Sequence, residues 1–407
     1  MTVEKMFRFS TLPLPIRTGR DARKIAGMKS GARNAILLSG YFGCGNLGDD
    51  LLLSAAVAGL RPLVPGGQFL VRDSGYATEF SDSGADVALT GVERILTERG
   101  VSKVSRVTRY FARMTGLLRR CRWLVFAGGT VFHERGDARS LIIQWMICRL
   151  ARLLGVRIAA LGVGISQLNS ARGRWMVRDI VRKSELFLVR DEAGQRQVAG
   201  TPARVSGDLV FDWRELAALR RPFAVGTTTG PRTIALAVCP AAFQGAAEQR
   251  AVAAFSEAAR IWHSHGHRLA LLVFQSEGAG PGDQSMFAQI TKHLGQDKPI
   301  DTRLLIPSPE SLADAYRDID VLCGMRFHGF VVAALFGVPF VGVAHDNKIS
   351  EICRQFDMCC LDAGTFDGTA LAAAAEASFD RGPDPALVER SATEAHENFR
   401  AFADVLA

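Results

Sequence analysis

The clearest indication of the fold of this 407-residue chain is Gly324-Met325-Arg326-Phe327-His328-Gly329, continued by Phe330-Val331-Val332-Ala333-Ala334-Leu335-Phe336-Gly337-Val338-Pro339. The short apolar run 320–323 before it predicts a buried strand that ends at Gly324. Residues 328–336 predict a short helix that Gly337 can stop, and residues 340–343 predict the next strand. A strand–helix–strand order of this kind is typical of a parallel sheet covered by helices.

Arg326 and His328 fall where that strand gives way to the helix. The unpaired N–H groups and the dipole of a helix N-terminus favour an anion there. Arginine can bind a phosphate or carboxylate with two hydrogen bonds, and histidine can exchange a proton near neutral pH. The pair therefore indicates a site for chemistry on a small anionic group. A structural arginine beside a satisfied histidine is the alternative.

The same alternation of strands and helices runs through most of the chain. Apolar runs near residues 35, 69, 123, 158 and 186 predict strands in the first half, and runs near 233, 269, 302, 320 and 339 predict strands in the second. We expect an α/β protein of two Rossmann-like domains facing a cleft, which is where a substrate would bind. The expected parts are an extension at 1–33, a domain at 34–220, a linker at 221–232, a domain at 233–384 and a helix at 385–407.

The net charge of +8 is concentrated near the N-terminus. Residues 1–33 contain eight basic residues and two acidic ones, so +6 of the total belongs there and residues 34–407 are nearly neutral. We expect a disordered basic extension without the apolar region of a secretory signal peptide. Met28 precedes the first predicted strand, which leaves open a start at either Met1 or Met28. Because the body is nearly neutral, we expect no nucleic-acid partner.

The eight cysteines show no paired spacing, and most lie in apolar runs. They are expected to be small buried side chains in a reducing compartment, which favours a cytoplasmic protein. The sequence shows no metal-ligand spacing, so neither a metal nor an organic cofactor is expected.

A glycine-rich loop, residues 40–50, follows the first predicted strand and opens the first long helix. Its glycines allow the backbone to approach a ligand closely, and Asp49 and Asp50 stand at the helix start. The spacing fits neither a dinucleotide-binding fingerprint nor a P-loop. A functional loop is our prediction, with simple helix capping by an aspartate as the alternative.

Further polar residues follow other predicted strands. Gly129 and His133 follow the strand near 123, and Arg190 ends the strand near 186. Lys348 follows the strand near 340, where it could add positive charge to the Arg326 pocket. Asp208 ends another turn and is expected to be structural. The alternative for His133 is an exposed loop histidine without a role in binding. The alternative for Arg190 is a surface residue.

These turns, in this order, resemble the polysaccharide pyruvyl transferase family over roughly residues 35–365. The resemblance rests on the loop at 40–50, Gly128-Gly129, Arg190-Asp191, Met325-Arg326-x-His328, Gly337-Val338-Pro339 and Asp346-x-Lys348. The chain departs from the family pattern at Thr130, which replaces the third glycine of a Gly-Gly-Gly turn. It also departs at Asp50, where glutamate is usual, and at His345, where an aromatic residue is usual. These departures leave the acceptor specificity open.

The resemblance implies two domains of the glycosyltransferase-B type, with the acceptor on the N-terminal side. It implies transfer of pyruvate from phosphoenolpyruvate, as a ketal, to a sugar of a surface polysaccharide or cell-wall glycan precursor. The acceptor would be a lipid-linked or polymeric glycan. Arg326 and His328 carry over as the donor-binding and catalytic pair, and Arg190 as a second anion ligand.

Ketal formation needs an acid, a base and ligands for two anionic groups. We expect His328 to handle a proton, and Arg326, helped by Lys348 or Arg190, to hold the donor. Asp49 or Asp50 could deprotonate the acceptor hydroxyl. Gly129 is assigned to the donor, and the residues assigned to the acceptor are Gly43, Gly45, Asn46 and His133.

Residues 106–122 form a basic segment with apolar residues at helical spacing. A surface helix that packs its apolar side on the first domain is the ordinary interpretation. The alternative is peripheral contact with anionic lipid at the inner membrane face.

Two other functions remain open for the whole chain. One is a nucleotide-sugar-dependent glycosyltransferase of the same architecture. The other is a non-catalytic glycan-binding partner of an assembly complex.

Overall fold

A computed structural model describes residues 34–74, 86–134, 139–220, 230–276, 282–292, 294 and 300–406. Residues 34–407 form one compact unit. The predicted extension at 1–33, and residues 221–229 of the predicted linker, lie outside the described part.

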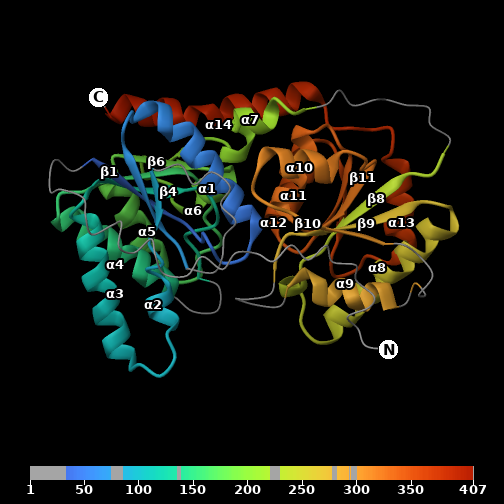
Figure 1. Ribbon diagram of the computed structural model, residues 1–407, viewed down its shortest axis with the longest axis horizontal. Coiled ribbons are helices and arrows are strands. Elements are labelled where there is room, and N and C mark those ends of the chain that lie inside the picture. The colour runs from blue at the N-terminus through green and yellow to red at the C-terminus, as the bar shows by residue number, and fades with distance from the viewer. Residues whose placement is uncertain are drawn as a thin grey trace. The chain divides into compact units, whose positions relative to one another are not determined.

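The first half of this unit is built on a seven-stranded parallel sheet in the order β3-β2-β1-β4-β5-β6-β7 (Figure 1). Its strands are β1 (Ala35–Ser39), β2 (Gln68–Arg72), β3 (Val87–Leu89), β4 (Cys121–Ala127), β5 (Arg157–Val163), β6 (Leu186–Val189) and β7 (Arg204–Val205). The helical elements are α1 (Leu47–Leu60), η4 (Arg61–Leu63), α2 (Arg94–Thr97), α3 (Lys103–Leu118), α4 (Arg139–Leu153), α5 (Ala171–Lys183), α6 (Glu192–Gln197), η5 (Leu209–Asp212) and α7 (Arg214–Ala217).

The second half is built on a six-stranded parallel sheet in the order β10-β9-β8-β11-β12-β13. Its strands are β8 (Thr233–Ala237), β9 (Arg268–Val273), β10 (Asp301–Leu304), β11 (Val321–Gly324), β12 (Phe340–Ala344) and β13 (Cys359–Asp362). The helical elements are η6 (Pro240–Ala242), α8 (Ala246–Ser264), α9 (Asp283–Lys292), α10 (Pro309–Tyr316), α11 (Phe327–Leu335), α12 (Asn347–Gln355), α13 (Gly368–Ala377) and α14 (Pro385–Leu406). Two parallel sheets with helices confirm the predicted fold class of two Rossmann-like domains.

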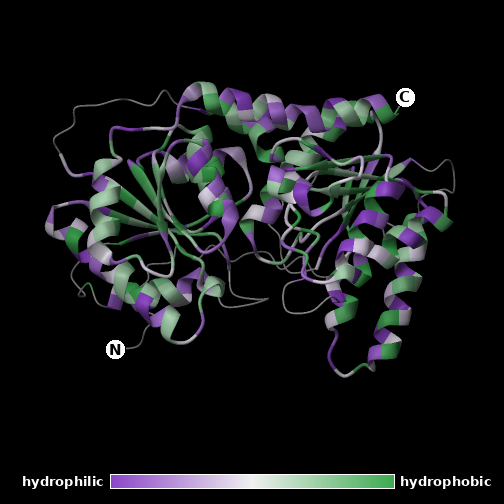
Figure 2. Ribbon diagram, turned by 180° about the vertical axis from the view of Figure 1, so that it is seen from behind, coloured by the Kyte–Doolittle hydropathy of each residue, from purple (hydrophilic) through white to green (hydrophobic). Residues whose placement is uncertain are grey.

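Helices cover both faces of the first sheet, which explains why its strands read as unbroken apolar runs. Buried residues of α3, α4 and α5 pack on one face of the sheet. Buried residues of α1 and α14 pack on the other face. Figure 2 shows the apolar strands inside and the polar residues on the outer helix surfaces. The core on the α1 side continues into α10 and α11 of the second half.

The C-terminal helix α14 packs on the first sheet, although it follows the second sheet in sequence. Its Phe402 ring meets the Trp123 ring of β4 edge-on, with centroids 5.0 Å apart. The buried Asn398 accepts a hydrogen bond from Ser206 Oγ (2.8 Å) and donates one to the Gly207 carbonyl (3.0 Å). The helix therefore ties the end of the chain back to the first half.

Some local expectations differ from the structure. The edge strands β3, β7 and β13 were not predicted, because they have only two to four residues each and none of their residues is fully buried, so their apolar signal is short. Cys359 and Cys360 lie on β13 and are exposed rather than buried. The basic helix expected at 106–122 begins and ends earlier, at 103 and 118, and Arg122 belongs to β4. None of the described helices is long and apolar enough to cross a bilayer.

Candidate active site

Several predicted site residues meet where the carboxyl ends of strands from both sheets lie close together. The glycine loop follows β1, the Gly-Gly turn follows β4, Arg190 follows β6 and Arg326 follows β11. Open parallel sheets bind ligands at this edge of their strands.

The glycine loop is held by backbone pairing with the segment after β9. Leu47 N donates to Phe274 O (2.8 Å), and Ser276 N donates to Gly45 O (3.1 Å). Gly45 has a φ of +76°, and an added Cβ would lie 2.9 Å from Ser276 Oγ. Glycine is therefore required at 45 by both backbone conformation and space. This pairing joins the two halves of the unit beside the start of α1.

Two aspartates at the start of α1 have different surroundings. The Asp49 carboxylate accepts a hydrogen bond from Asn46 Nδ2 (2.7 Å), while Asn46 Oδ1 caps the helix at Gly48 N (3.2 Å). Asp50 is buried, and its Oδ1 accepts from Gly43 N (3.0 Å), which closes the loop on itself. Asp49 therefore lies beside the meeting point of the two halves, whereas Asp50 holds the loop.

Burial raises the pKa of both carboxyl groups. For Asp49 the raising effect of burial exceeds the opposing effects of His328, Asn46, Lys348 and Arg326. For Asp50, burial and the neighbouring Asp49 and Asp73 carboxylates raise the pKa to about 7, against the Gly43 hydrogen bond. Asp50 can therefore take up and release a proton near neutrality, and Asp49 holds a proton more readily than an exposed aspartate does.

His328 lies in the first turn of α11, between the start of α1 and Asp208. A Cβ added to Gly48 would lie 2.3 Å from His328 Nδ1, so α1 approaches the ring as closely as a glycine allows. On the other side, His328 Nε2 lies 3.4 Å from Asp208 Oδ2. The imidazole is therefore fixed between a backbone segment and a carboxylate.

Asp208 links His328 to Arg190. Asp208 Oδ2 lies 3.6 Å from Arg190 Nη1, and Asp208 Oδ1 accepts from Val210 N (3.1 Å) to cap η5. Burial acts to raise the pKa of Asp208, but His328 and Arg190 outweigh it and hold the pKa below its ordinary value. The Arg190 guanidinium also lies over the Phe327 ring, 4.3 Å from its centroid. Asp208 is thus an ionised carboxylate between two basic side chains.

Arg326 is anchored inside the second half. Its Nε donates to Val238 O (2.8 Å), and its Nη2 forms an ion pair with Asp283. Asp283 is fully buried and also accepts from Phe274 N (2.8 Å) and Gln275 N (2.9 Å). Arg326 therefore fixes the start of α11 against the segment that pairs with the glycine loop.

Lys348 lies at the start of α12, where its Nζ is 3.2 Å from Asp346 Oδ2. His345 Nε2 is 3.5 Å from the same oxygen. The Lys348 charge opposes the effect of burial on the pKa of Asp49, so Lys348 lies on the same side of the site as Asp49.

The Gly-Gly turn after β4 lies against Asp49. Gly128 and Gly129 have φ values of +65° and +71°, which favour glycine. A Cβ added to Gly129 would lie 3.3 Å from Asp49 Oδ1. Thr130, the departure from three glycines, has its Oγ1 3.1 Å from a Cβ added to Gly164.

His133 belongs to a separate cluster on the first half. The Tyr41 hydroxyl lies 2.7 Å from His133 Nε2 and 2.7 Å from Ser140 Oγ, and the Tyr41 and His133 rings stack with centroids 5.7 Å apart. Burial raises the pKa of Tyr41, so its hydroxyl keeps its proton at neutral pH. The cluster thus combines a phenol hydroxyl, an imidazole and a serine hydroxyl, which are groups that can form hydrogen bonds with uncharged molecules.

A group of potential metal ligands lies at the opposite, amino-terminal edge of the second sheet. His265, His267 and Glu376 have ligand atoms within 4.8 Å of one another. His267 Nδ1 accepts a hydrogen bond from Arg232 N (3.2 Å), which places the proton of a neutral ring on Nε2, the atom that faces Glu376. A protonated nitrogen cannot bind a metal, so we assign no metal to this group.

The structure thus brings together Asp49, Gly129, Arg190, Arg326, His328 and Lys348 from both halves of the unit, with Asp50, Gly43, Gly45 and Asn46 shaping the loop. Asp208 and Tyr41 were not predicted as site residues. Asp208 follows a strand closely, in the same way as Arg190-Asp191 follows β6. This position after a strand was the sequence signal that could have identified Asp208 as a site residue. No sequence signal relates Tyr41 to His133, which is 92 positions away.

A sequence model of the family described as polysaccharide pyruvyl transferase matches residues 46–347. A comparison with curated proteins finds no match to this sequence.

Solved structures with a similar fold include nucleotide-sugar epimerases. The UDP-GlcNAc 2-epimerase of Methanocaldococcus jannaschii, in complex with UDP-GlcNAc and UDP, has a TM-score of 0.59 and 11% identity, covering 90% of this chain and 98% of that one. The UDP-N-acetylglucosamine 2-epimerase of Rickettsia bellii has a TM-score of 0.58 and 9% identity, covering 91% and 95%. The Neisseria meningitidis UDP-GlcNAc 2-epimerase bound to UDP-GlcNAc has a TM-score of 0.53 and 10% identity, covering 91% and 99%. At these identities the likeness shows a glycosyltransferase-B-like fold and nothing finer.

Proposed function

Since the chain belongs to the polysaccharide pyruvyl transferase family, we propose that it transfers pyruvate from phosphoenolpyruvate to a sugar, as a ketal. The acceptor would be a surface polysaccharide or a cell-wall glycan precursor, either polymeric or lipid-linked. The observation that carries the proposal is the chain of three side chains His328, Asp208 and Arg190. His328 comes from the second half, and its ring lies against Gly48 in the first turn of α1, next to Asp49.

Phosphoenolpyruvate carries a phosphate and a carboxylate, so its site needs positive charge. Arg190 and Lys348 supply that charge from two different halves. The start of α11 adds backbone N–H groups that face an anion. Arg326 was expected to bind the donor directly. Its guanidinium, however, already donates to Val238 O and pairs with Asp283. We propose that Arg326 chiefly positions His328, which lies two residues further on.

The chemistry has two steps that conserve atoms and charge. In the first, a proton adds to the methylene carbon of phosphoenolpyruvate while one sugar hydroxyl attacks C2 and loses its own proton. In the second, a neighbouring hydroxyl attacks C2, its proton is lost, and inorganic phosphate leaves with the C–O bonding pair. The sum is one ketal and one phosphate, and it uses no metal or organic cofactor.

His328 is suited to deliver the first proton. Asp208 remains ionised because its pKa is lowered, and a fixed carboxylate stabilises a neighbouring imidazolium. A positioned acid of this kind contributes roughly 10²–10⁴-fold to a rate.

Asp49 is suited to accept the hydroxyl proton. Its pKa is raised mainly by burial, which makes it a stronger base than an exposed aspartate. Tyr41 and His133 lie on the same half of the unit as Asp49 and are proposed to orient the sugar.

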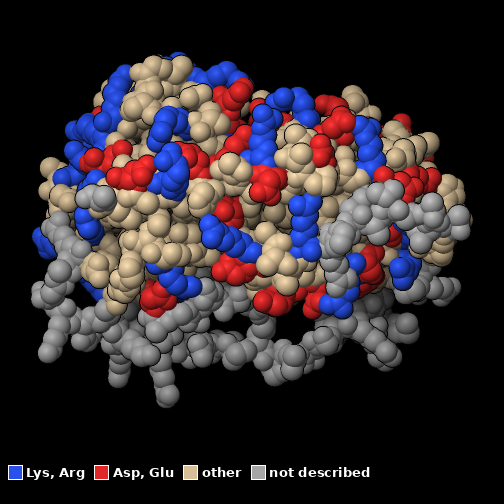
Figure 3. All heavy atoms as spheres, turned by 90° about the horizontal axis from the view of Figure 1, so that it is seen from above, with Lys and Arg blue, Asp and Glu red and all other residues tan. Residues whose placement is uncertain are grey.

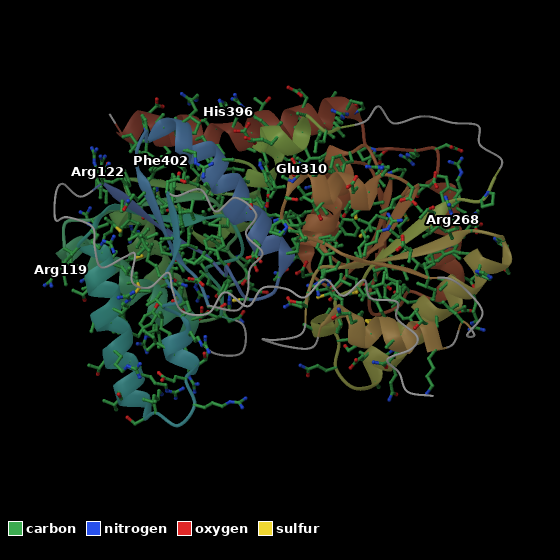
Figure 4. The ribbon with its side chains drawn as sticks, viewed as in Figure 1. Arg119, Arg122, Arg268, Glu310, His396 and Phe402 are labelled. Atoms are coloured by element: carbon green, nitrogen blue, oxygen red, sulfur yellow. The ribbon has the colours of Figure 1, made fainter. Side chains whose placement is uncertain are left out.

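The test is acceptor-dependent release of phosphate from phosphoenolpyruvate, using a panel of lipid-linked and free glycosides. His328→Gln should abolish release while leaving the protein folded, as far-UV circular dichroism would show. His396→Gln is the matched control, because His396 lies on α14 and pairs with Asp212 (2.9 Å) away from the site (Figure 4). Full activity of His328→Gln would remove this residue from the mechanism.

A nucleotide-sugar-dependent glycosyltransferase is the second candidate, favoured only by the fold shared with enzymes of that substrate class. It predicts release of a nucleoside diphosphate instead of inorganic phosphate. Thermal stabilisation by nucleotide sugars, and none by phosphoenolpyruvate, would replace the proposal with this candidate. Stabilisation by glycans without turnover of either donor would indicate a glycan-binding partner instead.

A further inference from the structure

The outer surface of three successive helices, α3, α4 and α5, carries an unusual excess of positive charge. These helices contain twelve basic residues and one acidic residue, Asp179. Their net charge of +11 exceeds the +8 of the entire chain, so the other residues are negative in sum. We call this three-helix surface the basic face.

The helices form one continuous layer, because the buried residues of all three pack on the same face of the first sheet. Their buried sides consist of apolar residues such as Met114, Ile147 and Ile180, which leaves the charged residues to point outward. The opposite layer differs. Figure 3 looks onto the side of α14, where Lys and Arg alternate with Asp and Glu. The positive charge therefore belongs to one layer of the fold.

Some of the basic residues are neutralised locally, and others are not. Arg109 pairs with Glu98, Arg152 with Glu185 and Lys183 with Asp179. Lys103, Arg113 and Arg119 are exposed along the length of α3 and its C-terminal end, and no carboxylate among the described residues lies within ion-pair distance of them. These three charges remain available to an external anion.

Large apolar side chains are exposed among these charges. Val104 at the start of α3 is 77% exposed and Val107, one turn later, is 38% exposed. Trp175 near the start of α5 is 55% exposed. All three helices run antiparallel to the strands of the sheet, so these residues lie toward the carboxyl edge, where the candidate site is.

We infer that the basic face docks the protein onto the surface of an anionic phospholipid bilayer. Basic side chains attract the headgroups, and tryptophan and short aliphatic side chains enter the boundary between headgroups and acyl chains. The phosphates of a nucleic acid would pair with the basic side chains, but a nucleic acid backbone has no apolar region in which Val104 and Val107 could be buried. The inference goes beyond the proposed transfer reaction, and it places the candidate site close to a membrane-bound acceptor.

The test is co-sedimentation of the full chain with phosphatidylcholine vesicles that contain or lack 30% phosphatidylglycerol. We expect binding only to the anionic vesicles, weakened at 0.5 M salt because screening shortens the reach of surface charges. The triple variant Lys103→Gln, Arg113→Gln, Arg119→Gln should lower the partition coefficient by roughly 100-fold, since each basic residue near the surface contributes about 1 kcal/mol.

The matched control removes the same charge from exposed positions of the second half, as Arg250→Gln, Arg260→Gln, Lys292→Gln. It should bind vesicles as the unaltered protein does. Val104→Ser with Trp175→Ser should weaken binding while leaving the charge unchanged. Equal binding by the triple variant and its control would overturn the inference, as would retention of single-stranded RNA without retention of anionic vesicles. Vesicle binding requires no turnover, so failure here is distinguishable from failure of the proposed reaction.

Discussion

Replacing Gly48 with alanine should separate helix stability from catalysis. Gly48 lies in the first turn of α1, and alanine is a better helix former by up to about 1 kcal/mol. However, the added Cβ would lie 2.3 Å from His328 Nδ1, 3.1 Å from Cγ and 3.3 Å from Cβ. Because all three atoms are close, including the one attached to the backbone, rotation of the ring cannot relieve the contact.

The size of the effect follows from these distances. Ordinary contacts begin near 3.4 Å, so His328 or the start of α1 must move by about 1 Å. A displacement of about 1 Å at a reacting group costs on the order of 10²-fold in rate. We therefore expect kcat/KM for phosphate release to fall about 100-fold, equivalent to ~2.7 kcal/mol of transition-state stabilisation.

The assay is phosphate release together with urea unfolding, with Gly116→Ala as the matched control. Gly116 is exposed within α3, and an added Cβ there meets no atom within 4 Å. The control should gain up to about 1 kcal/mol of stability and keep full activity. Wild-type kcat/KM in Gly48→Ala would refute the placement of His328 against α1 or its role in the reaction.

Two further predictions concern the buried carboxyl groups. Asp208→Asn leaves His328 and Arg190 without their shared carboxylate, and loss of one partner from a buried ion pair costs roughly 3–5 kcal/mol. Because the folded-state pKa of Asp208 is lowered, the stability that its carboxylate contributes is present above the unfolded pKa of about 4 and is lost as the pH falls through the folded pKa. Urea unfolding should therefore show a large difference in stability between the variant and the unaltered protein at pH 7, and a smaller one at pH 3. An equal difference at both pH values would contradict this explanation. Asp50→Asn should have the opposite effect, because a folded pKa of about 7 means that stability is lost as the pH rises through 4 to 7. The amide oxygen of the variant can still accept a hydrogen bond from Gly43 N. The variant should therefore be more stable than the unaltered protein by up to roughly 4 kcal/mol at pH 8, and equally stable near pH 4. Lower stability of the variant at pH 8 would show that the ionised carboxylate is needed.

The strands and helices of both halves could be predicted because their signals are local. Residues 36–38, 124–126 and 321–323 form continuous apolar runs, as is typical of parallel strands covered on both faces, and Gly337 stops α11 as expected. The short edge strands gave no such signal. The chain also determined by itself which strand ends carry charged residues, because those residues directly follow the apolar runs.

The grouping of these residues was decided by the tertiary structure. Arg326 looked like a free anion ligand in sequence, but its guanidinium is engaged by Asp283, 43 positions earlier. Asp208 looked like a turn residue, but α11 brings His328 against it from 120 positions later. The helix α14 follows the second sheet in sequence yet packs on the first, through Phe402 and Asn398.

The sequence by itself therefore determined the fold class and the strand ends where charged residues stand, because hydrophobic periodicity and glycine turns depend on neighbours within a few residues. Which of these charges face one another depends on contacts between residues that are distant in sequence. An ion pair depends on the approach of two side chains to within about 4 Å. That approach is set by the packing of α1 against α11 and of both sheets against their helices. Local sequence patterns contain no information about this packing.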